Sequence, residues 1–487
     1  MVRRNLRVLA VVGLGAMAAC GDGASVPSSG AADDAGVAPQ AFGELVSVEQ
    51  IAVYQAVKVS LVSEGATVVP NAPVIAKRPA LVRLHAKAPL STKVPKLVAE
   101  LRVRNPGQPD VVLQSGPRPL GAFQEGDLSS SFYWELEAEQ VTQGAQLSVE
   151  IRDPSGADPS VIRYPSTGEL SMNVGAFEPT LKVKFVPIKY QADGSDRVPA
   201  MDDLTIEGYR QALYKMYPVT AVDISVRDVV AWPLVVRGDG EGWSQLLDAV
   251  METREDDKPA DDVYYVGVFV PAATQREYCE AGCVLGVAPA VGLAENVSLR
   301  TAMIVGYHSE HLHGTLAQEL AHAMGRMHAP CGNPAAIDRK YPYDDASIGA
   351  WGWDLEQRKL VDPDEVYDFM SYCNPVWVSD YTYAGIYARM AKVDREKRPE
   401  VTEPPPSAMK TYHVAKDGTL RPGPTIHGGL ARSSDELVLE NGAHQAVGKV
   451  RGSFHALSNI GGGILVTPTE IPAATLKRAR FARTVAQ

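Results

Sequence analysis

Apolar and polar residues alternate in short runs over residues 43–178, which is the pattern of half-buried β-strands. The runs are separated by turn-forming Pro, Gly, Asn and Asp residues. Strands of this length and spacing predict a β-sandwich domain over residues 43–178. The clearest runs are 66-ATVVP-70, 80-ALVRLHA-86, 97-LVAELRVR-104 and 146-QLSVEIRD-153.

The pattern changes near residue 180, where apolar strands begin to alternate with segments of helical period. Residues 203–218 and 242–255 are predicted helices, the first with Asp203 as its N-cap, and a later helix is expected from about Tyr381. Strand–helix alternation predicts an α/β domain over residues 179–395. Its predicted strands are residues 181–188, 222–228, 262–271 and 301–307.

The remainder of the chain is predicted to form a linker and a third region. Residues 396–409 contain 403-EPPPS-407, and such proline-rich segments form stiff linkers. Residues 410–487 are rich in glycine and in short strands, which predicts a small β-rich C-terminal region. We therefore expect a multidomain α/β and β protein, as a chain of 487 residues requires.

The N-terminus has the pattern of an export signal. Arg3, Arg4 and Arg7 precede an apolar stretch that is too short to span a membrane permanently, and small residues then lead to Cys20. The sequence 18-AAC-20 resembles a bacterial lipobox, so residues 1–20 are predicted to be a lipoprotein signal peptide with Cys20 lipidated; ordinary secretion is the alternative. We expect an outer-membrane or cell-surface lipoprotein, held to the membrane by this anchor through a flexible tether at residues 21–42.

The charge of the chain restricts its partners. The formal net charge is −11. An acidic surface disfavours nucleic acid, because phosphate binding requires a basic face.

One helix carries a possible metal site, within 315-TLAQELAHAMGRMHAPCG-332. Gln318 and His322 lie one helical turn apart on the same face, and Glu319 lies beside them. Gly325 permits a sharp turn that would return His328 to the same point. Catalytic zinc takes three protein ligands and an open position for water, and an adjacent glutamate can accept the proton of that water.

The helix and a second segment, 367-YDFMSYC-373, resemble the metzincin clan of zinc endopeptidases over roughly residues 180–393. The resemblance implies a zinc cofactor held by His322 and His328, and Glu319 as the general base that activates the water. It also implies that Met370 lies beneath the metal and that Tyr372 reaches the metal or the transition state. A protein or peptide would then be the substrate.

Four cysteines remain if Cys20 carries lipid, an even number that suits an oxidising compartment. Three pairings are possible, and a four-thiolate zinc site is disfavoured because paired C-x-x-C spacings are absent. In the metzincin arrangement Cys331 and Cys373 would leave the site from neighbouring positions. We therefore favour this pair, together with Cys279–Cys283.

The chain departs from the metzincin pattern at Gln318, which stands where the first histidine ligand belongs. A neutral amide is a poorer zinc ligand than imidazole. Loss of the histidine therefore costs part of the binding free energy, which is roughly 10–16 kcal/mol at structural zinc sites. Upstream His311 or His313 could replace it if a loop folds back; otherwise that segment is a polar loop that caps the helix through Thr315. Tyr372 could also act as a ligand.

Two functions follow from this departure. The first is a cell-surface zinc metalloendopeptidase, possessing weakly held zinc and hydrolysing peptide bonds with zinc-activated water. The alternative is a catalytically inactive pseudoprotease that binds surface peptides or polymers. Loss of the first ligand favours the alternative, whereas retention of Glu319, His322, His328, Met370 and Tyr372 favours the enzyme.

Overall fold

The computed structural model describes residues 42–89, 95–290, 296–307, 310–396, 407–428, 435–472 and 478–481. These residues belong to one compact unit, Ala41–Gln487. The predicted signal peptide with Cys20, the tether up to residue 41 and residues 397–406 of the predicted linker lie outside them. Within the described ranges, no helix has both the length and the apolar character needed to cross a membrane.

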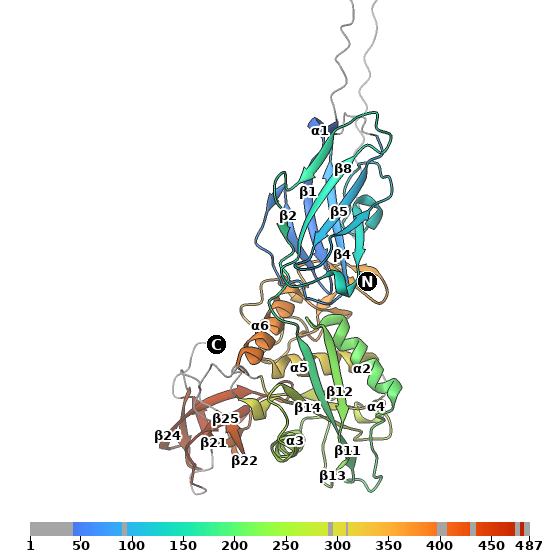
Figure 1. Cartoon of the computed structure of the whole chain (residues 1–487). Coiled ribbons are helices and arrows are strands. Elements are labelled where there is room, and N and C mark those ends of the chain that lie inside the picture. Colours follow the sequence, from blue (N-terminus) through green and yellow to red (C-terminus); the bar gives the residue numbers. More distant parts are fainter. Residues whose placement is uncertain are drawn as a thin grey trace, which may run out of the picture. The chain divides into compact units, whose positions relative to one another are not determined.

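The N-terminal part, after the short helix α1 (Phe42–Leu45), consists of two antiparallel sheets (Figure 1). Inward-facing side chains such as Val53 and Val82 of one sheet share a core with Leu101 and Val149 of the other. Burial alternates along the strands Val98–Arg104 and Phe132–Leu136, as period-two side-chain direction requires. The strands are β1 (Ser47–Tyr54), β2 (Lys58–Ser63), β3 (Ala66–Thr67), β4 (Ala80–Lys87), β5 (Val98–Arg104), β6 (Val111–Gln114), β7 (Phe132–Leu136), β8 (Gln146–Arg152), β9 (Val161–Tyr164) and β10 (Leu170–Ser171). The first sheet has the order β3-β2-β1-β4-β7, and the second has the order β10-β8-β5-β6 with β9 beside β8.

A largely parallel sheet forms the centre of the molecule. Its strands are β11 (Thr180–Tyr190), β12 (Ala221–Val226), β13 (Val230–Trp232), β14 (Val263–Phe269), β15 (Gly286–Val287) and β16 (Thr301–Val305). The order is β12-β11-β14-β16-β15, with β13 beside β11. The edge strand β15 is antiparallel to β16, whereas the other pairs are parallel.

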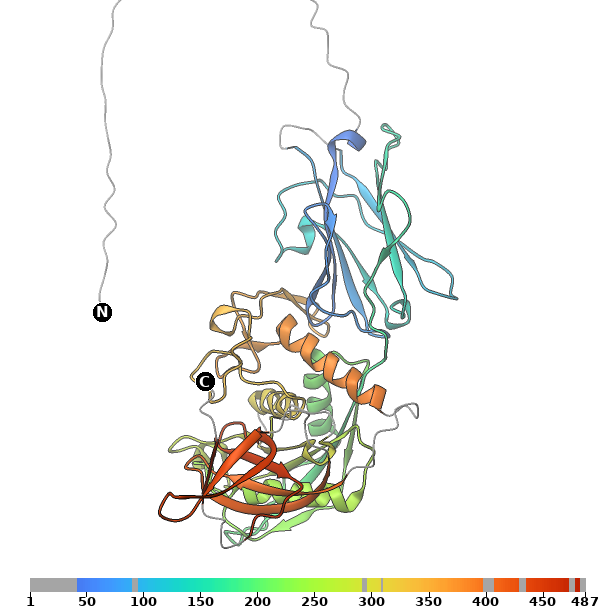
Figure 2. The same ribbon diagram turned by 90° about the vertical axis from the view of Figure 1, so that its left-hand side faces the viewer.

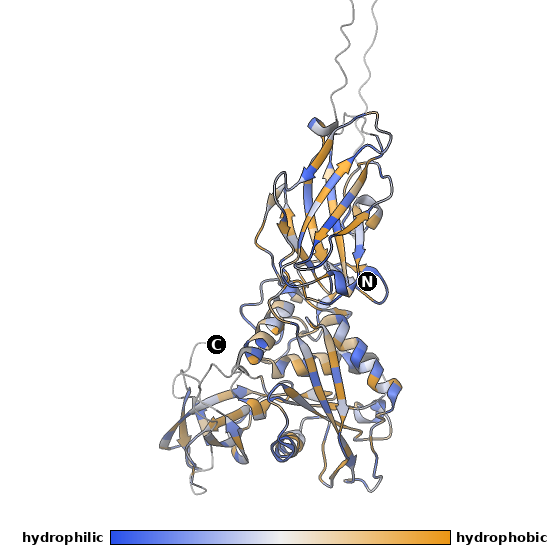
Figure 3. Cartoon of the chain, viewed as in Figure 1, coloured by the Kyte–Doolittle hydropathy of each residue, from blue (hydrophilic) through white to orange (hydrophobic). Residues whose placement is uncertain are grey.

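Helices cover both faces of this sheet (Figures 1 and 2). The helices are α2 (Asp203–Met216), α3 (Trp243–Asp257), α4 (Gln275–Tyr278), α5 (Glu310–Ala323) and α6 (Asp380–Glu396). Val183 and Phe185 of β11 share a core with residues of α2, α5 and α6, while Val186 and Ile188 point to the opposite face and pack in the core that contains α3. Figure 3 shows the corresponding apolar residues along the central strands.

The start of α2 corrects one sequence expectation. Asp202, rather than Asp203, is the N-cap: its carboxylate accepts a hydrogen bond from the backbone N–H of Thr205 at 2.8 Å. Asp203 is the first helical residue, where its negative charge still interacts favourably with the helix dipole.

Two short strand pairs lie between α5 and α6. They are β17 (Gly352–Asp354) with β18 (Lys359–Val361), and β19 (Tyr367–Asp368) with β20 (Val376–Trp377). The second pair frames Met370.

The C-terminal part is a six-stranded sheet with the order β22-β21-β25-β24-β23-β26. Its strands are β21 (Ser407–Val414), β22 (Leu420–Gly428), β23 (Asp435–Glu440), β24 (Ala446–Ala456), β25 (Gly463–Thr467) and β26 (Arg478–Phe481). Met409, Ile426 and Val466 share one core with Trp243 of α3 and Val287 of β15. The sheet therefore packs on the α3 face of the central domain and buries there an apolar face that it could not bury alone.

Buried polar contacts join the N-terminal sheets to the central domain. The guanidinium of Arg78 has no exposed surface and donates to the carbonyl oxygens of Tyr217 and Val219 at 2.8 and 3.0 Å. These contacts give a buried charge hydrogen-bond acceptors at the end of α2, so the two parts are coupled by more than the chain connection.

Candidate functional site

The turn at Gly325 brings the two motif histidines together. Gly325 has φ 84° and donates its N–H to the carbonyl of His322 at 2.7 Å, while the N–H of Arg326 donates to that of Ala321 at 2.9 Å. This is the hydrogen-bond pair of a Schellman ending, which requires a left-handed residue. The chain reverses there and returns His328 to the end of α5, as the spacing predicted.

His322 and His328 face each other through their Nε2 atoms, which are 3.1 Å apart. Each side chain is about 1% exposed. The Nδ1 atoms lie 2.7 Å from the carbonyl of Arg326 and 2.5 Å from that of Ala335, so each Nδ1 carries the proton and each Nε2 carries a lone pair. Two buried lone pairs pointing at each other repel unless a proton or a cation lies between them.

The electrostatic surroundings keep both imidazoles neutral. Burial holds the pKa of His322 well below its ordinary value, and the nearby ring of His328 lowers this pKa further. Burial also lowers the pKa of His328, and the hydrogen bonds that its ring makes to the Ala335 carbonyl and to the Asn459 side chain oppose this shift. Neutral imidazole is the form that binds metals.

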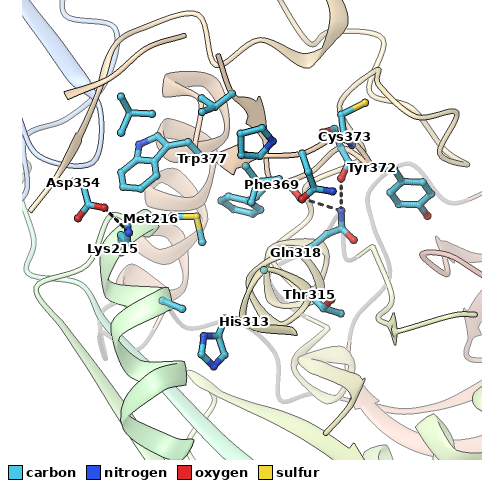
Figure 4. A pocket seen from close by; sticks show the side chains of 18 of the residues that line it. Lys215, Met216, His313, Thr315, Gln318, Asp354, Phe369, Tyr372, Cys373 and Trp377 are labelled. Atoms are coloured by element: carbon cyan, nitrogen blue, oxygen red, sulfur yellow. Dashed lines mark hydrogen bonds and ion pairs between the residues drawn. The ribbon is translucent and has the colours of Figure 1, made fainter. Parts of the chain in front are cut away.

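Gln318 connects α5 to the segment around Met370 instead of presenting an imidazole. Its side-chain Nε2 donates to the carbonyl oxygens of Phe369 and Ser371 at 3.0 and 3.1 Å (Figure 4). Both amide protons are thereby used, and only Oε1 remains for a cation. Within the described residues, no cluster of three or more His, Cys, Asp or Glu side chains could hold a metal. From these three side chains a cation could therefore gain two imidazoles and at most one neutral oxygen.

The Met370 segment is fixed against His328 by several contacts. Buried Asp368 accepts from the backbone N–H of Met370 at 2.7 Å, and the carbonyl of Met370 accepts from Ala329 at 3.0 Å. The disulfide Cys331–Cys373 closes the same arrangement. The second expected disulfide, Cys279–Cys283, is also present.

His313 does not replace the missing ligand. The helix α5 already begins at Glu310, so Thr315 lies inside it and is not its cap. His313 projects from α5 against Tyr209, with ring centroids 5.1 Å apart. The side chain of His311 lies outside the described residues.

Glu319 is completely buried, and residues far along the sequence hold both of its oxygens. Ser458 Oγ donates to Oε2 at 2.7 Å, and Asn459 Nδ2 donates to Oε1 at 2.7 Å. Burial raises the pKa of Glu319 to about 8, although these two hydrogen bonds oppose the shift. No motif in the sequence marked Ser458 or Asn459, which lie in a glycine-rich loop.

The hydroxyl of Tyr372 also points to this loop. It donates to Asn459 Oδ1, and the tyrosine ring lies edge-on to His328 at 5.0 Å between centroids. In this structure Tyr372 therefore serves as a partner of Asn459, beside the histidine pair. Burial raises its pKa to about 12.

A cleft of about 1570 Å³ runs beside this centre (Figure 4). Gln318, Tyr372 and Asn459 line it, together with Leu285 and Gly286 at the sheet edge. Glu319 and both motif histidines lie behind this lining. The cleft is large enough for a peptide segment, but its wall separates it from the buried carboxylate.

The segment that contains this centre matches a known peptidase family. Residues 303–373 match the family model described as Peptidase M66. This range includes β16, α5 and the Met370 segment. No curated protein matches the chain. The match supports a peptidase-like function for the segment that builds the site.

Proposed function

We propose that the chain is a peptide-cleaving hydrolase of the metzincin type that depends on a weakly held divalent cation, with zinc as the expected ion. The convergence of His322 Nε2 and His328 Nε2 at 3.1 Å carries the proposal. Both nitrogens are buried, and Glu319 lies on the same helix beside them. The match to a peptidase family over residues 303–373 supports the same interpretation.

The residues fit a divalent cation that is bound weakly. His322 and His328 would hold it through Nε2, and Gln318 could add only Oε1, because its amide nitrogen is bonded to the carbonyls of Phe369 and Ser371. Bound there, the ion would supply Lewis acidity, which polarises a peptide carbonyl and makes water more acidic. A neutral third ligand predicts weaker binding than three imidazoles would give.

The remaining chemistry belongs to residues of the chain. Glu319 would accept a proton from the attacking water on a carboxylate oxygen and deliver it to the leaving amine nitrogen. Met370 and Asp368 would hold the floor of the site, and Tyr372 would donate a hydrogen bond to the substrate oxygen once its hydroxyl leaves Asn459. The peptide would lie in the cleft along β15, whose edge can add a strand.

The chain is further proposed to be an exported lipoprotein anchored through Cys20, acting on proteins or peptides outside the cell. The alternative, a protein that binds peptides without cutting them, is favoured by one observation: Gln318 is engaged with the Met370 segment rather than left available for a metal.

One experiment separates the two functions. Zinc binding by the full chain would be measured by calorimetry, and hydrolysis of unfolded, fluorescently labelled casein would be followed with added zinc. We expect the full chain to bind zinc and His322→Ala and His328→Ala to abolish this binding. We also expect casein hydrolysis, which Glu319→Ala should abolish while zinc binding remains. Zinc binding without hydrolysis would favour the binding protein.

A further inference from the structure

The loop Leu457–Gly462, which joins β24 to β25, lies against the edge strand of the central sheet. The backbone N–H of Ser458 donates to the carbonyl of Ala288 at 3.0 Å, and that of Ala290 donates to the carbonyl of Ala456 at 2.7 Å. Pro289 and Leu457 form an antiparallel bridge between these two bonds. The C-terminal sheet thus pairs by an antiparallel bridge with the residues that follow β15, in the manner of a bound extended peptide.

The side chains of this added strand occupy the polar groups of the site. Besides its bond to Glu319, Asn459 Nδ2 donates to the carbonyl of Gly286 at 2.8 Å, and Ser458 Oγ accepts from the N–H of Ala288 at 2.9 Å. Asn459 Oδ1 accepts from Tyr372. One serine and one asparagine therefore engage the proposed base, the sheet edge and the tyrosine at once.

The contact leaves no space for water or substrate at Glu319. A Cβ placed on Gly286 would lie 2.6 Å from Glu319 Cγ, so the sheet edge already touches the side chain. Asn459 covers it on the cleft side. A water molecule can reach the carboxylate only after Ser458 and Asn459 withdraw.

The loop is shaped and anchored for this position. Asn459 and Gly461 have φ of 53° and 69°, left-handed values that Asn and Gly adopt readily. Leu457 is 4% exposed in the core shared with α3, and Ile460 packs against the same core.

We propose that residues Ala456–Asn459 are an internal occupant of the peptide-binding edge, which competes with substrate and keeps the site latent. The catalytic consequence rests on the proposed function, but the competition does not. The occupant also indicates the class of ligand: an extended peptide pairing antiparallel to residues 286–290, with small hydrogen-bonding side chains beside Glu319.

The first test weakens the occupant without altering its backbone. The double substitution S458A/N459G removes the contacts to Glu319, Gly286 and Tyr372, and glycine retains the left-handed conformation. The probe is a fluorescein-labelled peptide with the sequence of residues 455–461, HALSNIG, and its binding to the full chain is measured by anisotropy without metal. We expect at least about 10-fold tighter binding, because each hydrogen bond removed from Ser458 and Asn459 favours withdrawal of the occupant. Asn441→Gly, in the neighbouring hairpin, is the matched control and should leave binding unchanged.

The second test holds the occupant in place. Pro289 and Leu457 are a non-hydrogen-bonded antiparallel pair, whose Cα separation of about 4.5 Å suits a disulfide. The oxidised P289C/L457C chain should bind the probe at least about 10-fold more weakly than wild type, and mild reduction should restore binding. The unaltered chain under the same reductant is the control, and thermal melting checks that each variant is folded.

The outcomes separate this proposal from the proposed function. Probe binding that neither change alters would overturn the internal occupant, even if casein is hydrolysed. Tighter binding by S458A/N459G with no casein hydrolysis in zinc would support the occupant and overturn the peptidase. Casein hydrolysis that rises in S458A/N459G and stops in the oxidised P289C/L457C chain would support both.

Discussion

The Nε2 atoms of His322 and His328 lie 3.1 Å apart in a site that excludes water from both rings. Because each Nδ1 is bonded to a backbone carbonyl, the two lone pairs are fixed toward each other. The fold maintains this repulsive contact by the Schellman turn at Gly325. The arrangement is stable with a cation or a shared proton between the rings, which is why metal binding is the first property to measure.

Restoring histidine at position 318 should strengthen zinc binding. Gln318→His would supply an imidazole one turn before His322, at the cost of the hydrogen bonds to Phe369 and Ser371. A third nitrogen ligand is worth several kcal/mol at zinc sites, so we expect at least about 100-fold tighter binding by calorimetry. Gln211→His, an exposed helical position on α2, is the matched control. Unchanged affinity in Gln318→His would mean that position 318 is not directed at the metal.

The Cys331–Cys373 disulfide should contribute more stability than Cys279–Cys283. The first closes a separation of 42 residues and the second a separation of 4. Loop-closure entropy then predicts losses of about 4 and about 2 kcal/mol when each pair is changed to alanine. Denaturant unfolding of the two double variants measures the difference. Equal losses would indicate that strain or residual unfolded structure, rather than loop length, determines the effect.

The folded chain should lose stability in acid through His455 of β24. Burial lowers the pKa of His455 from 6.5 to about 4. Between these values the unfolded chain binds a proton that the folded chain does not, so this stabilisation is complete above pH 6.5 and is lost as pH falls toward 4. We expect a loss of about 2 kcal/mol from pH 8 to pH 5 through this group.

His455→Gln tests this pH dependence because glutamine does not titrate. Its unfolding free energy should change less between pH 8 and pH 5 than that of the wild type, measured by chemical denaturation at each pH. His427→Gln is the control, since His427 lies on the same sheet with an exposed side chain. If His455→Gln and wild type have parallel pH profiles, another group causes the acid sensitivity.

Lipidation at Cys20 remains a prediction from the sequence. Cys20→Ser should release the chain from the membrane fraction, because the apolar stretch before it is too short to span a membrane as a permanent helix. Fractionation and metabolic labelling with palmitate would measure the change, with Cys279→Ser as a control that retains Cys20. Unchanged partitioning of Cys20→Ser would refute the anchor.

The sequence by itself determined the features that depend on neighbouring residues. The spacing of Gln318 and His322 predicts two side chains one turn apart on a single helix, and Gly325 predicts a turn after it; the structure has the helix and the turn. Strand alternation likewise predicted a mixed chain with several sheets. These inferences succeed because helix periodicity and left-handed glycine geometry act within a few residues.

Only the tertiary structure decided what surrounds Glu319. Ser458 lies 139 residues away from it along the chain, and no periodicity records that contact. The engagement of Gln318 with Phe369 and Ser371 is likewise a contact across the fold. Burial of the C-terminal sheet against α3 places the loop at the site, because apolar area is removed from water wherever complementary surfaces meet and without regard to sequence distance. The histidine pair could thus be predicted from local spacing, but the burial of Glu319 behind Ser458 and Asn459 depended on the packing of the whole chain.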